Sequence, residues 1–297
     1  MKKIINLVLI SLIILLSGCK KEQAKVLVPS GTPRIAQIYL EKEYDTSVVN
    51  GADALVAAFT SGEYEFIYAP INLGVKMYKS NQKYRLLGSV VSGNYYLVSK
   101  GEFTLEDLKN KEICLFSKNQ MPSIIANYVF EHNDLKNLNI SYVASVTEAQ
   151  NELILNNDLV VLTSEPSLSV LLDKIDGLTY LDLQASFKEI TGYESYPQAA
   201  LFVRNDVSKK KIDQYVKDLT VSIEKVMGKK VETADLQEEM NYGYDKLVFI
   251  NSLDRSNISF IPVNKNKQSF ESLINILFEY NAQLVGEIPN EEFYYQD

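Results

Sequence analysis

Beyond an N-terminal segment, the sequence alternates short apolar runs with helix-length amphipathic stretches, and this alternation constrains the fold more than any other feature. Glu65–Tyr68 has the composition of a buried strand. Ala52–Ser61 places Leu55 and Phe59 on one face of a helix. Strands that alternate with helices of about ten residues indicate βαβ units and a largely parallel sheet. The sequence therefore predicts an α/β protein.

The alternation occurs in two series, which indicates two lobes. A chain of 297 residues suits two lobes of roughly 120–150 residues each. No low-complexity linker separates the series, so we expect strands to cross between the lobes, with Tyr95–Lys100 and Ala199–Arg204 as candidates. The expected first lobe comprises residues 26–98 and 203–297, and the expected second lobe comprises residues 99–202.

The first 25 residues have the features of an export signal followed by a short tether. Two lysines precede the apolar run Ile4–Leu16, which is shorter than the roughly 20 residues of a membrane-spanning helix and is typical of a secretory signal. Small residues then lead to Cys19 in the pattern of the bacterial lipobox. We expect residues 1–18 to be a signal peptide, and residues 19–25 to be a lipidated cysteine and tether at the outer membrane face. An uncleaved anchor and an ordinary signal peptide are the alternatives.

Composition excludes several classes of function. Lys and Arg number 30 and Asp and Glu number 38, for a net charge of −8, so we expect no nucleic-acid partner. The chain has one histidine and two cysteines, too few for a multi-His zinc site or a disulfide framework. We therefore expect no metal and no cofactor. With Cys19 lipidated, Cys114 lies in an apolar run and is expected to be a buried free thiol.

The sequence also lacks a recognisable catalytic pattern. His132 stands near the end of the predicted helix Ser123–His132, where a cationic cap is its expected role. There is no Gly-x-Ser-x-Gly elbow, no phosphate-binding Gly-rich loop and no Cys-x-x-Cys motif. We therefore expect a binding protein without catalytic residues.

The loops after the predicted strands are the candidate binding elements. In open α/β sheets, ligands bind beyond the carboxyl ends of the strands, near helix N-termini. These loops are short and polar, and they offer backbone N–H groups with small hydroxyl or amide side chains, which suit a small polar ligand. The loops are Ser30–Pro33, Asn50–Ala52, Ala69–Asn72, Ser117–Gln120 and Ser164–Pro166.

The same segments, together with the N-terminal address, resemble the substrate-binding proteins of ABC importers. The branch concerned takes up taurine, other sulfonates, nitrate and thiamine precursors. The resemblance implies a periplasmic-binding-protein type II fold, with two α/β lobes, two crossover strands and a ligand cleft between the lobes. The resemblance covers nearly all of the mature chain. It rests on the order and spacing of seven segments: Val28–Pro33, Gly62–Asn72, Thr163–Pro166, Tyr196–Arg204, Asn257–Pro262, Leu277–Asn281 and Glu291–Tyr295.

The resemblance also implies which residues line the cleft. They are Ser30, Gly31, Thr32, Ala69, Pro70, Asn72, Ser117, Gln120, Ser164 and Glu165. Tyr196 can add an aromatic face near a crossover. The family often has a small Gly/Ser/Thr loop where this chain has Ser117–Pro122, so the ligand class stays open.

The charged residues exclude only some classes of ligand. Of the four arginines, only Arg34 lies beside a cleft loop, so we expect no double-arginine clamp on a phosphate or dicarboxylate. Glu165 can either pair with a ligand ammonium or ring N–H, or complement the dipole of the helix that follows it.

These expectations combine into a solute-binding lipoprotein, extracytoplasmic and monomeric. It would capture a small polar organic molecule (a sulfonate, a pyrimidine or thiamine precursor, or another heterocycle) and deliver it to an ABC permease. One alternative is a surface lipoprotein that senses a ligand or contacts a host. The other is a pyrimidine-synthase-like enzyme of the same fold, which needs a cleft histidine that this sequence does not provide.

Overall fold

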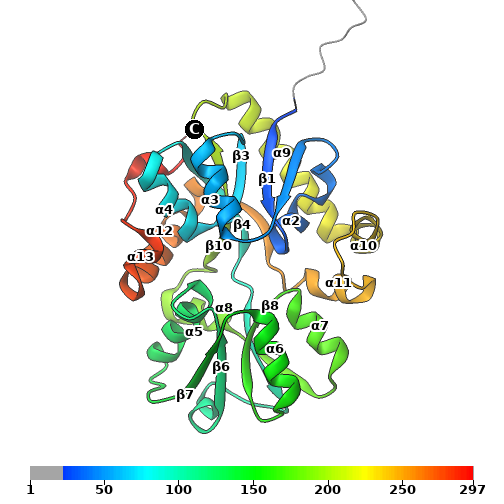
Figure 1. The fold of residues 1–297 in the computed structure, drawn as a ribbon, viewed down its shortest axis with the longest axis vertical. Helices are drawn as coiled ribbons and strands as arrows, with labels where there is room; N and C mark the ends of the chain where they lie inside the picture. The colour runs from blue at the N-terminus through cyan, green and yellow to red at the C-terminus, as the bar shows by residue number, and fades with distance from the viewer. Residues whose placement is uncertain (1–22, 297) are drawn as a thin grey trace, which may run out of the picture.

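The computed structural model describes residues 23–296, which form two α/β lobes stacked along the long axis of the molecule (Figure 1). This confirms the predicted fold class. The expected signal peptide and Cys19 lie outside the described residues. The sheet of the first lobe has the order β11 (Ile258–Pro262), β4 (Tyr84–Ser92), β10 (Pro197–Arg204), β3 (Phe66–Pro70), β1 (Lys25–Pro29) and β2 (Asp45–Val49).

In the first lobe, β1, β2 and β3 are parallel, whereas β10, β4 and β11 run antiparallel to their neighbours. The sheet is therefore mixed, and only half of it has the parallel arrangement that we predicted. The helical segments of this lobe are α2 (Thr32–Ala36), η1 (Ile38–Leu40), α3 (Ala52–Ser61), α4 (Ile71–Asn81), α9 (Lys209–Gly228), α10 (Lys230–Glu239), α11 (Lys246–Leu253), α12 (Val263–Tyr280), α13 (Ala282–Val285) and η3 (Glu291–Phe293).

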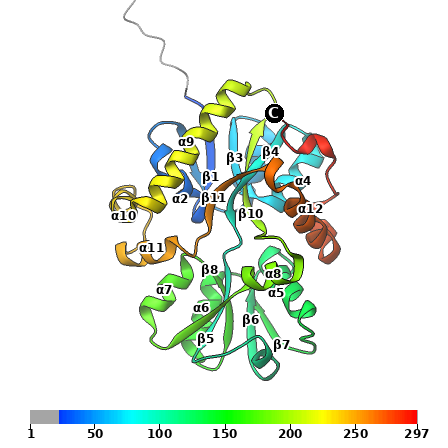
Figure 2. The same cartoon turned by 180° about the vertical axis from the view of Figure 1, so that it is seen from behind.

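Alternating strand residues bury both faces of this sheet. Val26 and Val28 of β1 pack in one cluster with residues of α2 and α9. Leu27, between them, packs in the other cluster with residues of α3, α4 and α12. Figure 2 shows α9 lying along one face of the lobe.

The second lobe has a five-stranded sheet. Its order is β7 (Asn139–Val143), β6 (Glu112–Phe116), β8 (Val160–Ser164), β5 (Tyr95–Lys100) and β9 (Leu178–Asp182). Strands β6, β7 and β8 are parallel, and β5 is antiparallel to both β8 and β9. Its helical segments are η2 (Glu106–Asn110), α5 (Met121–His132), α6 (Val146–Leu155), α7 (Ser167–Lys174) and α8 (Leu183–Thr191).

The two connections between the lobes are shorter than expected and lie at different residues. Strand β5 pairs only within the second sheet, so Tyr95–Val98 does not belong to the first lobe. Strand β10 pairs only within the first sheet, so Pro197–Phe202 does not belong to the second lobe. The chain crosses at Gly93–Asn94 and again at residues 192–196. The pattern could not reveal this, because the first link joins two apolar strands, β4 and β5, of similar composition, and the second follows helix α8, which the sequence did not predict.

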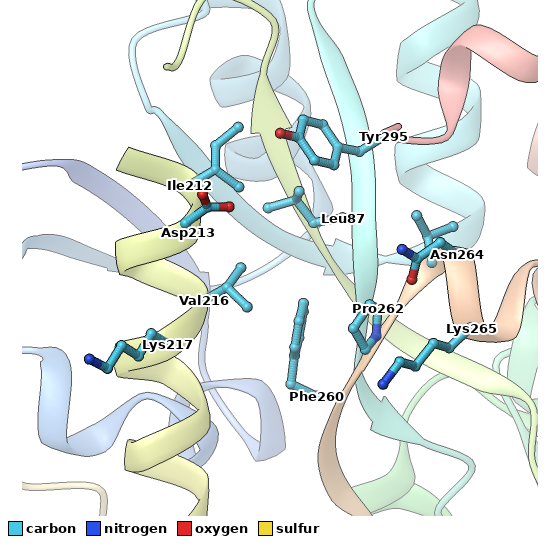
Figure 3. Close-up of a pocket in the computed structure, with 11 residues that line it drawn as sticks. Leu87, Ile212, Asp213, Val216, Lys217, Phe260, Pro262, Asn264, Lys265 and Tyr295 are labelled. Carbon is cyan, nitrogen blue, oxygen red and sulfur yellow. The ribbon is translucent and has the colours of Figure 1, made fainter. Parts of the chain in front are cut away.

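The C-terminal tail completes an edge of the first sheet. Strand β11 pairs with only the second half of β4. Beside the first half, Tyr294 forms a parallel bridge with Leu86, and the Tyr295 N–H donates to the Leu86 carbonyl at 3.0 Å. A groove of about 380 Å³ remains between α9 and β11, where Val216 and Phe260 face each other (Figure 3).

Cys114 in β6 is 1% exposed, as the sequence predicted, and burial raises the pKa of its thiol. Because the thiolate is the reactive form, we expect the native protein to resist a disulfide reagent such as DTNB at pH 8. Cys114 should react fully once guanidinium has unfolded the chain. A rapid reaction of this thiol in the native protein would contradict the prediction.

Candidate interlobe binding site

Four strand-end loops meet at the boundary between the lobes. Strands β1 and β3 are parallel neighbours, and so are β6 and β8, so the loops after each pair emerge at one edge of their sheet. The two edges face each other, because the Thr32 hydroxyl donates to the Glu165 carbonyl oxygen at 3.2 Å across the boundary. The structure therefore brings together the predicted loops Ser30–Thr32, Pro70–Asn72, Ser117–Gln120 and Ser164–Glu165.

An amide pair, of which Asn94 is buried and Gln198 is half-buried, fixes this boundary. The Asn94 side chain donates to the Thr32 hydroxyl oxygen at 3.3 Å. Asn94 and Gln198 exchange two further hydrogen bonds, from Gln198 Nε2 to Asn94 Oδ1 at 2.8 Å and from the Asn94 N–H to Gln198 Oε1 at 3.0 Å. These bonds join one interlobe link to the beginning of β10, and sequence reasoning gave neither residue a role.

Several of the predicted residues keep side-chain groups available for a ligand. Among residues 23–296, the side chains of Ser30, Asn72, Gln120 and Ser164 form no hydrogen bond to the protein, and each is exposed or half-buried. No side chain caps the first turn of α4 or α5, so backbone N–H groups at both helix starts are also available. Ser117 is partly used, because its hydroxyl donates to the Ala144 carbonyl at 3.2 Å.

Glu165 has a different role from the ligand pairing that we considered. Its carboxylate is fully buried and accepts hydrogen bonds from the Ser169 N–H at 3.1 Å, the Ser169 hydroxyl at 3.0 Å and Arg255 Nε at 2.5 Å. Burial raises the pKa of this carboxyl, and the Arg255 guanidinium acts in the opposite direction. In this conformation the carboxylate is fully engaged by the protein itself.

Ala69 and Tyr196 are two of the predicted site residues that the structure places in the core. Both are completely buried. The Tyr196 ring stacks at 6.0 Å on Tyr95 and meets Phe187 edge-on at 5.0 Å, and burial raises the pKa of the phenol well above its usual value. Tyr196 is therefore a packing residue at the interlobe link.

Arg34 does not face the cleft. Its Nε and Nη2 atoms bond the two Glu41 carboxylate oxygens at 2.7 and 3.0 Å, and the guanidinium lies 3.7 Å from the centre of the Tyr242 ring. Arg34 is thus committed to contacts within the first lobe. The expectation that only Arg34 lies beside a cleft loop is wrong, because Arg255 bonds Glu165 of the loop Ser164–Pro166.

No family model and no curated protein matches this sequence. Solved structures do match. An ABC transporter protein from Parabacteroides distasonis is 20% identical over 93% of this chain and 99% of that one, with a TM-score of 0.83. The periplasmic aliphatic sulphonate-binding protein SsuA from Escherichia coli is 14% identical over 93% of both chains, with a TM-score of 0.73. This chain has the periplasmic-binding-protein fold. The resemblance predicted from the motifs is confirmed at the level of fold.

A third solved structure with this fold is a ligand-binding component of an ABC-type import system from Staphylococcus aureus, which was solved with zinc bound. It is 14% identical over 92% of this chain and 96% of that one, with a TM-score of 0.68. In the present chain, residues 23–296 contain no group of three or more His, Cys, Asp or Glu side chains that could hold a metal ion. The same residues include no helix long and apolar enough to cross a membrane.

Proposed function

We propose that this protein is the extracytoplasmic solute-binding component of an ABC importer. It binds a small polar molecule between its lobes and presents it to a membrane permease. The contact between Thr32 and Glu165 carries the proposal, because it sets the available groups of four loops opposite one another across the lobe boundary. A ligand that touches both lobes favours the closed arrangement, and closure is the signal that a permease can recognise.

The available groups favour a neutral or singly anionic organic ligand. They are hydroxyls, amides and the helix-start N–H groups, which can hold one sulfonate or carboxylate, or the polar edge of a heterocycle. Lys118, the cation in the second-lobe loop, lies 5.0 Å from the centre of the Tyr142 ring. The sulphonate-binding structural neighbour supports a sulfonate as one candidate, beside a pyrimidine or thiamine precursor.

Binding without catalysis is part of the proposal. The single histidine, His132, lies at the C-terminal end of α5, whereas the cleft loop Ser117–Gln120 precedes the N-terminal end of that helix. The two ends are roughly 16 Å apart along the helix axis. The His132 Nδ1 atom lies 2.8 Å from the Tyr128 carbonyl, which suits a local structural role.

We further propose that the mature protein is a monomer tethered by a lipid on Cys19. Strand β1 begins at Lys25, which leaves a short polar segment between the lipid and the folded body. A tether of this kind keeps the binding protein near its permease and raises its effective concentration there.

A thermal-shift screen tests the proposed function. The purified protein is heated with alkanesulfonates, nitrate, pyrimidines or thiamine precursors, and a ligand at 100 times its Kd should stabilise the native state by about 2.7 kcal/mol and raise Tm by several degrees. Asn72→Ala removes an available cleft amide and should reduce the shift. Asn151→Ala removes an exposed amide of α6 and should leave it unchanged. Chemical turnover of these compounds without any shift in Tm would overturn the proposal.

A further inference from the structure

An arginine of the first lobe is inserted into the second lobe. Arg255 follows α11, and its Nε atom contacts Glu165 Oε1 at 2.5 Å, while its Nη2 atom donates to the Ser169 hydroxyl at 2.7 Å. Figures 1 and 2 both show α11 of the first lobe reaching α7 of the second lobe at this flank. Glu165 and Ser169 also bond each other, so the arginine completes a network that the second lobe has already organised.

Two tyrosines of the second lobe complete the recognition of Arg255. The Tyr96 hydroxyl donates to the Arg255 carbonyl at 2.7 Å, and the guanidinium lies 5.6 Å from the centre of the Tyr180 ring. We call Glu165, Ser169, Tyr96 and Tyr180 the Arg255 socket. All four belong to the second lobe, so all of these contacts cross the lobe boundary.

Together with Arg34–Glu41 inside the first lobe, Arg255–Glu165 is one of the two most buried ion pairs among the described residues. The Glu165 side chain is 0% exposed and that of Arg255 is 24% exposed, whereas most of the other ion pairs join strongly exposed side chains. Surface pairs contribute little to stability. Withdrawal of Arg255, in contrast, leaves a buried carboxylate without its counter-charge, which is costly.

The socket is also joined to the ligand cleft. Glu165 binds Arg255 through its side chain and accepts the hydrogen bond from Thr32 through its own carbonyl oxygen. The same residue therefore senses the position of a cleft loop and of the arginine.

We propose that Arg255 is an interlobe latch that holds the two lobes closed even without a ligand. The second lobe binds a guanidinium supplied by the first lobe at the place where we had considered a cationic ligand. The latch sets the population of the closed form, and the apparent affinity for any ligand scales with the fraction of binding-competent protein. The inference rests on the contacts between the lobes and does not require the proposed function.

Small-angle X-ray scattering of the ligand-free protein tests the latch. The wild-type protein should scatter as the closed form, and Arg255→Gln should increase the radius of gyration. Arg204→Gln is the matched control, because Arg204 pairs with Asp206 inside the first lobe, and it should leave the radius of gyration unchanged. An Arg255→Gln protein as closed as the wild type would overturn the proposal, and so would a ligand-free wild type that is already as open as Arg255→Gln.

A milder pair of variants keeps the test decisive if Arg255→Gln does not fold. Tyr96→Phe removes only the hydroxyl that bonds the Arg255 carbonyl, and it should accelerate amide hydrogen exchange at the start of α7. Tyr84→Phe is its control, because the Tyr84 hydroxyl bonds the Tyr64 carbonyl within the first lobe. Equal exchange at α7 in both variants would overturn the latch. The measurement uses no ligand, so it remains informative even if the thermal-shift screen excludes transport.

Discussion

Phe202→Ala is expected to lower the free energy of unfolding by about 3–5 kcal/mol, because it empties a completely buried position. Phe202 lies in β10, with its ring centre 5.4 Å from that of Phe59 and 6.2 Å from that of Phe293. Helix α4 packs closely against β10 at Gly74, since a Cβ on that glycine would lie 2.0 Å from Phe202 Cζ. Urea denaturation followed by circular dichroism measures the loss.

The matched control is Phe278→Ala, which truncates the same side chain at a position that is 36% exposed. We expect this variant to cost less than Phe202→Ala, because part of the Phe278 surface stays in contact with water in the folded protein, whereas Phe202 is completely buried. Similar losses in the two variants would show that the β10–α4 contact does not form the core of the first lobe.

Gly93→Ala should destabilise the closed arrangement of the lobes. A Cβ at this link would lie 2.2 Å from Tyr196 Cζ and 2.6 Å from Gln184 Oε1. Tyr196 has no room to withdraw, because it is held between Tyr95 and Phe187. Overpacking of this kind typically costs about 1–3 kcal/mol. The loss is measurable by urea denaturation, and an accompanying opening of the lobes is measurable by X-ray scattering.

Two companion variants separate the steric cause from a general effect of losing a glycine. Gly228→Ala adds a methyl group at the end of α9 where nothing lies within 4 Å, so it should be nearly neutral. Adding Tyr196→Leu to Gly93→Ala shortens the opposing side chain and should recover part of the loss beyond what the two single changes predict. Strict additivity would indicate that the Tyr196 ring is not the obstacle.

The sequence was sufficient to predict the α/β alternation and the positions of the strand-end loops, because both depend on local patterns. Ser30 and Asn72 lie in such loops, since polar residues after a buried strand lie at a sheet edge wherever that strand pairs; their role in binding stays a prediction. Helix α8, helix α11 and strand β11 were not predicted. In α11 the buried Val248 and Phe249 are adjacent in the sequence and give a weak helical periodicity, and β11 is only half-buried for most of its length.

The contacts between the lobes could not be predicted from local sequence patterns. Arg255 and Glu165 are 90 residues apart in the sequence, and Asn94 and Gln198 are 104 residues apart. Nothing near Arg255 indicates that its partner lies in the other lobe. The sequence left open whether Glu165 pairs with a ligand or complements a helix dipole, and its pairing with Arg255 depends on a contact that only the tertiary structure specifies.

The place of the C-terminal tail in the first sheet has a consequence for synthesis of the protein. Until Tyr294 and Tyr295 have been translated, the first half of β4 lacks the segment that covers its edge. An uncovered strand edge is a template for pairing with other chains. The segment around Tyr294 and Tyr295 thus protects this half of β4 from pairing with other chains, so a chain that lacks the segment should aggregate more readily.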